Sequence, residues 1–142
     1  RSYIFNQILA QRVQQANWNQ ALAGEAWMLE GTKSIFGPEA FTDELAQRLA
    51  ELDIHPTGPM WGNGELRSQE KVLEIESTLA AQFPEICMGL AKADLRQERR
   101  ALRLVVKNLS WNFVADDVLQ LSFELPPGAY ATSVLAELGD FS

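Results

Sequence analysis

The side chains best suited to bind a polyanion form one short basic cluster. Arg99, Arg100 and Arg103 stand close together in a chain whose formal net charge is -7. A guanidinium group binds phosphate through two parallel hydrogen bonds, so such clusters are typical of phosphate-binding sites. In a strand, Arg99 and Arg103 would share one face and Arg100 would point to the other. We expect at least one of them to contact RNA; the alternative is a solvated strand edge that pairs with Glu98 and neighbouring acids.

A second candidate is an aromatic residue where two expected elements meet. Tyr130 follows a strand that ends in Pro126-Pro127-Gly128, and it opens a helix. A flipped-out base can stack on such a ring, close to the backbone N–H groups of the helix start. Residue type alone favours the plainer interpretation, an aromatic of the core or surface.

Signatures of other chemistry are missing from the sequence. It has no Gly-rich phosphate loop and no nucleophile elbow, and one histidine with one cysteine cannot build a zinc site. We therefore expect no metal. His55 lies in a Pro- and Gly-rich stretch and is expected to hydrogen-bond to backbone, and Cys87 is expected to pack in a helical stripe. The four tryptophans are expected in the core or at an interface.

Composition limits the class of protein. A chain of 142 residues with 46% hydrophobic and 22% charged residues is typical of one soluble globular domain. No apolar run approaches the about 20 residues that span a bilayer, so we expect no membrane partner. The single cysteine suggests the reducing cytoplasm. A start without Met, inside a helical pattern, suggests a piece of a longer chain. The sequence pI of about 4.7 argues against a stand-alone nucleic-acid binder, so a cationic groove would have to lie mostly elsewhere in the parent chain.

Helices are expected mainly in the first two thirds of the chain. Residues 3–13 have an apolar helical face, with Arg12 on the other side. Thr42 is expected to cap a helix over 43–52, and Ser68 to cap the next one. Further helices are expected over 85–93, after Pro84 in the first turn, and over 129–138.

Strands are expected around these helices and above all in the last third. Residues 25–30 could form a strand, and 54–64, with two prolines and three glycines, must be a loop or irregular strand. Apolar residues over 101–106 and an alternation over 118–125 predict antiparallel strands, with a turn at Asp116-Asp117. The sequence therefore predicts an α+β fold.

Four segments, in order and spread over the whole chain, resemble the tRNA pseudouridine synthase D (TruD) family. They match the family patterns RSxxFNxxLxxRV, PTGPLWG, xERRALR and FxLPxGSYATSVL. In this chain they are residues 1–13, 56–62, 97–103 and 123–135.

The resemblance implies a helix-rich insertion domain followed by part of the antiparallel catalytic sheet of a pseudouridine synthase. We expect residues 1–98 to belong to the insertion domain and residues 99–142, strands and a terminal helix, partly to the catalytic domain. The implied activity is isomerisation of uridine to pseudouridine in tRNA, at position 13 in bacterial members. The implied partner is tRNA, and neither a metal nor an organic cofactor is implied.

The resemblance also implies which residues of the family's active site this chain contains. The family's catalytic aspartate lies in a GxKD-type motif upstream of the matched segments, so we assign no catalytic residue and expect the chain alone to be inactive. The GSYATS match implies that Tyr130, Thr132 and Ser133 line the uridine pocket. Substrate contacts by Arg99 and Arg100 are implied less directly. Ala136 stands where the family often has arginine, which removes one charged contact.

Two further interpretations remain open at this point. The chain could be a non-catalytic α+β domain that binds RNA or protein, or a purely structural interaction domain. Binding of tRNA that weakens steeply with salt separates the first from the last. A partial sheet also leaves exposed edges, so we expect self-association of the isolated chain or partial disorder near its ends.

Overall fold

The computed structural model describes residues 2–105, 107–115 and 118–124. The chain divides into two compact units, Arg1–Arg103 and Leu104–Ser142, and each is considered by itself. The described residues combine four helices with antiparallel strands, which confirms the α+β class. The expected domain limit between residues 98 and 99 remains an expectation about the parent enzyme; the contacts within this chain group residues 99–103 with the first unit.

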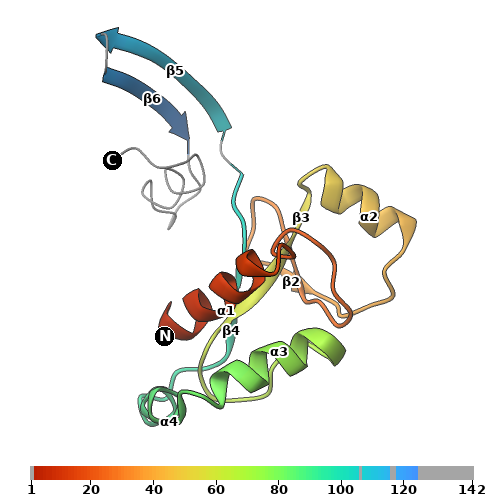
Figure 1. Cartoon of the computed structure of the whole chain (residues 1–142). Helices are drawn as coiled ribbons and strands as arrows, with labels where there is room; N and C mark the ends of the chain where they lie inside the picture. The colour runs from red at the N-terminus through yellow and green to blue at the C-terminus, as the bar shows by residue number, and fades with distance from the viewer. Residues whose placement is uncertain (1, 106, 116–117, 125–142) are drawn as a thin grey trace. The chain divides into compact units, whose positions relative to one another are not determined.

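The first unit is built on a four-stranded antiparallel sheet with the order β2-β1-β3-β4 (Figure 1). Its central strand, β3 (Ile54–Met60), is the stretch expected to be irregular. β3 changes partner along its length: Ile54 to Pro56 pair with β1 (Trp27–Leu29), and Thr57 to Met60 pair with β4 (Glu98–Ala101). The remaining strand, β2 (Ile35–Phe36), pairs with β1.

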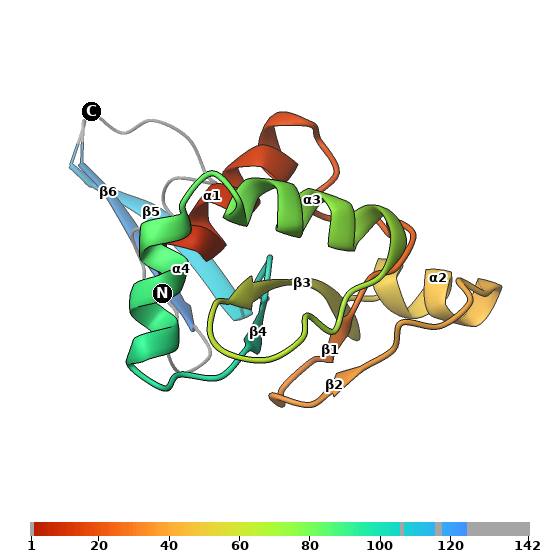
Figure 2. The ribbon, with the colours of Figure 1, turned by 90° about the horizontal axis from the view of Figure 1, so that it is seen from below.

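Four helices pack with this sheet or with one another in the described part of the chain. The longest, α1 (Ser2–Gln14), packs across β3 and against α3 (Glu70–Ala80), as Figures 1 and 2 show from two directions. α4 (Pro84–Lys92) has its proline in the first turn, as predicted. Two apolar clusters form the core of the first unit: one of Ile4, Ile8 and Leu79, and one of Trp27, Leu45 and Ile54.

The remaining helix, α2 (Asp43–Ala50), begins as the sequence predicts. The Thr42 side chain accepts a hydrogen bond from the Leu45 N–H at 3.3 Å, and acidic residues occupy the first turn. The helix ends two residues before the expected Leu52, because Leu52 adopts a left-handed φ of 63°.

Two expectations about helices are wrong. Arg12 does not lie on the polar side of α1: it is 1% exposed and shares the buried face with Ile4 and Ile8, because these positions are four residues apart. Ser68 does not cap α3, since the N-cap residue is Gln69 and makes no side-chain bond. Backbone carbonyls from residues 23 and 24 take that role, accepting from the N–H groups of Val72 and Gln69 at 3.1 and 3.0 Å.

The second unit contains a two-stranded antiparallel hairpin of β5 (Lys107–Ala115) and β6 (Val118–Glu124). This confirms the alternating strand expected over 118–125. The strand expected over 101–106 is displaced toward the N-terminus, as β4. The expected turn at residues 116–117 and the helix over 129–138 lie outside the described residues. No helix in the described part of the chain is long and apolar enough to cross a membrane.

Candidate nucleic-acid interface

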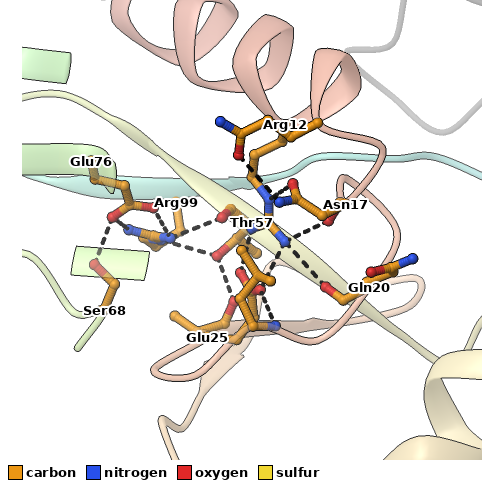
Figure 3. Close-up of polar contacts among 11 residues, drawn as sticks. Arg12, Asn17, Gln20, Glu25, Thr57, Ser68, Glu76 and Arg99 are labelled. Carbon is orange, nitrogen blue, oxygen red and sulfur yellow. Dashed lines mark hydrogen bonds and ion pairs between the residues drawn. The ribbon is translucent and has the colours of Figure 1, made fainter. Parts of the chain in front are cut away.

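Arg99 points into the first unit, where its donors are engaged (Figure 3). Its guanidinium donates from both Nη atoms to the Glu76 carboxylate at 2.8 Å, and from Nε and Nη2 to the hydroxyl and carbonyl of Thr57 at 3.0 and 2.9 Å. Glu76 also accepts from the Ser68 hydroxyl at 2.6 Å. The side chains of Arg99 and Glu76 are 5% and 1% exposed. Arg99 therefore joins β4 to β3 and α3, and a carboxylate already occupies its fork.

Arg100 lies on the opposite face of β4 and is exposed, as strand alternation predicts. Its guanidinium carbon stands 5.4 Å from the ring centre of Phe5, a buried residue of α1. This cation–π contact supports the side chain without neutralising its charge. Opposite Arg100 in the register is Gly58, where an added Cβ would come within 3.1 Å of Leu102 and 3.2 Å of Phe5. Of the two arginines expected to meet a substrate, Arg100 is the exposed one.

Arg103 shares an inward direction with Arg99 but contacts different groups. Its Nε donates to His55 Nδ1 at 2.8 Å, and its Nη2 donates to the carbonyls of Leu49 and Ile54, both at 2.8 Å. Because a guanidinium can only donate, His55 Nδ1 accepts, and the proton on Nε2 is left for Glu30 Oε2 at 2.8 Å. Burial lowers the pKa of Arg103, and the Glu30 carboxylate partly opposes this shift. His55 thus bonds to side chains, not to backbone as expected from the sequence.

A buried ion pair, not predicted from the sequence, fixes the turn after α1 (Figure 3). Arg12 donates from Nη1 and Nη2 to the two carboxylate oxygens of Glu25, at 2.9 and 3.0 Å. Arg12 Nη2 also donates to the carbonyls of Asn17 and Gln20, at 2.8 and 3.1 Å. Burial raises the pKa of Glu25, while the hydrogen bond and charge of Arg12 oppose this rise. The spacing of Arg12 from Ile4 and Ile8 was the available signal, because it places all three on one helical face.

Other candidate residues have ordinary surroundings. Cys87 is half-buried beside the cluster of Ile4, Ile8 and Leu79, and burial raises the pKa of its thiol. Trp27 lies in the core and Trp61 packs against this same cluster. Within residues 2–105, 107–115 and 118–124, no group of three or more histidine, cysteine, aspartate and glutamate side chains could hold a metal ion.

The expected pocket residues lie in the part of the chain that the structure does not describe. These are Tyr130, Thr132 and Ser133, together with Ala136. Their roles stay predictions from the sequence motif. Among the described residues, β6 ends at Glu124, before this segment in the sequence, and β4 carries the exposed Arg100.

Comparison with known proteins identifies the family. The model of tRNA pseudouridine synthase D (TruD) matches residues 1–138, nearly the whole chain. The chain belongs to the TruD family. A protein named tRNA pseudouridine synthase D from Xanthomonas axonopodis pv. citri is 51% identical over 142 residues, and one of the same name from Pseudomonas aeruginosa is 46% identical. In both, 99% of this chain is covered, but only 38% and 39% of the relative, so the chain spans about two fifths of a TruD protein.

The fold agrees with that of a solved structure named for the TruD family. A crystal structure from Methanosarcina mazei superposes with a TM-score of 0.72 and 24% sequence identity. The match covers 96% of this chain and 35% of that one. At this identity the likeness concerns the fold alone, and it agrees with a partial TruD chain that has an α+β architecture.

Proposed function

We propose that this chain forms part of an enzyme that isomerises uridine to pseudouridine at position 13 of tRNA. The match of residues 1–138 to the TruD family carries the proposal. Since the chain covers 38% of a relative named for this activity, we place the catalytic aspartate in the remainder of the parent protein. The present chain would then supply tRNA-binding and uridine-pocket residues and would be inactive by itself.

The uridine pocket would be lined by Tyr130, Thr132 and Ser133. Support comes from the segment that contains them, which resembles the family's GSYATS motif. The target base would be flipped out and stacked on Tyr130, a contact typically worth about 1–3 kcal/mol per base. The uracil would detach, rotate and rejoin through carbon, with the aspartate of the parent chain as the acting group.

Arg100 is the proposed phosphate contact on β4. It is exposed, whereas Arg99 is held by Glu76 and would act indirectly, by keeping β4 against β3. We expect Arg100→Gln in the complete protein to weaken tRNA binding and to lower the slope of log affinity against log salt by about 1. Lys33→Gln, in an exposed loop, is the matched control. Fluorescence anisotropy over a salt series measures the tRNA affinity and its salt dependence for both variants. An unchanged slope for Arg100→Gln would show that this residue does not contact a phosphate.

We further propose that the enzyme works in the cytoplasm and without a metal or organic cofactor. The single cysteine agrees with a reducing compartment. Isomerisation through an aspartate and a held base also leaves no chemical step that requires a cofactor.

The deciding experiment compares this chain with the complete reading frame that contains it. Each is incubated with unmodified tRNA, and pseudouridine at position 13 is measured. We expect formation by the complete protein and none by the chain alone. If the complete protein forms no pseudouridine but binds tRNA, the alternative of a non-catalytic RNA-binding domain is correct. Activity of the chain alone would contradict the placement of the aspartate outside it.

A further inference from the structure

A shallow hollow in the first unit combines an aromatic ring, side-chain amides and a guanidinium group. It has a volume of about 480 Å³ and is open to solvent. Its lining includes Asn19, Gln20, Phe41, Leu49 and Arg103. Of the three arginines of the basic cluster, Arg103 lines the hollow, whereas Arg99 and Arg100 do not.

Phe41 gives the hollow a flat apolar platform. This residue is 52% exposed, an unusual position for a phenylalanine. Its ring is stacked on that of Trp27, with ring centres 6.1 Å apart and planes inclined by 20°. Because Trp27 is buried and supports the phenylalanine from behind, the ring is held in place with much of its surface open to solvent. Such a surface suits a planar aromatic ligand.

Arg103 gives the hollow a positive charge that is only partly compensated. Among the described residues, its Nη1 makes no hydrogen bond and its guanidinium forms no direct ion pair with a carboxylate. The Glu30 carboxylate compensates this charge in part, and His55 joins it to Arg103 by hydrogen bonds. The hollow therefore complements a ligand with negative charge.

The walls of the hollow are fixed before any ligand arrives. The turn that carries Asn19 and Gln20 is held by the buried Arg12–Glu25 pair, through the bond from Arg12 to the Gln20 carbonyl (Figure 3). On the other side, Phe41 directly precedes Thr42, which caps α2. A site with prearranged walls loses little free energy in ordering when it binds.

From this arrangement we propose that the hollow binds one unpaired nucleotide of an RNA, with the base on Phe41 and the phosphate near Arg103. Asn19 and Gln20, which also line the hollow, would supply amides to the edge of the base. This inference rests on the proposed function, because it takes tRNA as the RNA. It adds a contact made by residues of the first unit, and it gives an acidic chain a way to hold RNA through stacking more than through net charge.

The test measures binding of unmodified tRNA to the complete protein and to its Phe41→Ala variant. We expect the variant to bind about 5-fold to 150-fold more weakly, the range that corresponds to one stacked base. Phe41→Trp should bind as the unchanged protein does, because it keeps an aromatic platform. Met88→Ala, an equally exposed apolar residue on α4 that does not line the hollow, is the control and should have no effect. Thermal unfolding of each variant shows whether the fold is kept.

The outcomes separate this inference from the proposed function. Unchanged tRNA affinity of Phe41→Ala, in a protein that forms pseudouridine, would overturn the inference and leave the function standing. An equal loss for a fully paired RNA duplex would also overturn it, because no unpaired nucleotide would be involved. A protein that binds tRNA without forming pseudouridine would overturn the proposed activity, and the Phe41→Ala affinity would still decide the inference. A protein that does not bind tRNA at all would overturn both.

Discussion

Arg12 and Glu25 form a buried ion pair in which each charge depends on the other. Their side chains are 1% and 2% exposed, so neither can be solvated if its partner is removed. We expect Glu25→Gln to destabilise the protein by about 3–5 kcal/mol, the usual cost of leaving one charge of a buried pair without its partner. Urea unfolding followed by circular dichroism measures this change. Glu39→Gln, at an exposed loop position, should change the free energy of unfolding by less than about 0.5 kcal/mol.

Cys87 allows a second prediction at the scale of one residue. Because burial raises the pKa of its thiol above the ordinary value of 9.0, the thiolate is rare at neutral pH. The rate of alkylation by iodoacetamide should therefore rise with a midpoint above 9.0. Between 9.0 and the raised pKa, the unfolded chain loses this proton and the folded chain keeps it, so this group's contribution to stability is lost as pH rises. An alkylation midpoint below 9.0 would show that the thiol is activated instead.

The surroundings of a side chain can be predicted from the sequence where its partners are close along the chain. They are predicted poorly where a partner is distant in the sequence. Thr42 caps α2 because its partner is three residues away in the chain. Arg12 was assigned to solvent because its partner, Glu25, lies beyond the helix. The partners of Arg99 lie still farther, 42 residues away at Thr57 and 23 at Glu76. Alternation separates the face of Arg99 from that of Arg100, but only the fold shows that the face of Arg99 is buried and that a carboxylate meets it there.

At the scale of elements, α3 depends on a turn far from it in the sequence. The chain at residues 23–24 approaches the start of α3 so closely that a Cβ on Gly24 would overlap the carbonyl oxygen of Gln69. Gly24 also has a left-handed φ of 85°. We expect Gly24→Ala to destabilise the protein by at least about 2 kcal/mol, since strained φ and steric overlap act together.

Gly31→Ala is the matched control for this substitution. Gly31 has a similar φ of 77° but no atom within 4 Å of an added Cβ. Gly31→Ala should therefore lower the free energy of unfolding only by the strain of the backbone conformation, about 1 kcal/mol. The two variants are compared by urea unfolding and by hydrogen exchange at the first turns of α3. Equal destabilisation would mean that close packing against Gln69 contributes nothing.

β3 shows why elements without a clear period are hard to predict. Its two prolines lack the backbone N–H donor. The sequence of this stretch is therefore compatible with either a loop or an irregular strand. The structure reconciles prolines with a central strand by changing the partner after Pro56. The two partners of β3 come from opposite ends of the first unit's sequence, β1 before it and β4 long after it. No local sequence pattern predicts which strands will pair with β3. By contrast, the limits of β6 agree closely with the prediction, because apolar and polar residues alternate along this strand.

At the scale of the whole molecule, the edges of the sheet suggest how the isolated chain behaves. The four-stranded sheet ends in β2 on one side and β4 on the other, and each has a single partner within the described residues. The chain also spans 38% of a TruD relative. Unpaired strand edges pair with other chains when nothing covers them.

We therefore expect the isolated 142-residue chain to self-associate with rising concentration, and the complete protein to do so far less. Sedimentation velocity over a concentration series measures both, at high salt as well as low, because a net charge of -7 makes the copies repel each other when screening is weak. Association should thus be stronger at high salt. Hydrogen exchange at β4 should become slower as the isolated chain associates. An isolated chain that remains monomeric at every concentration, with both of its ends protected from exchange, would contradict the prediction and show that this part of a TruD protein is a self-sufficient domain.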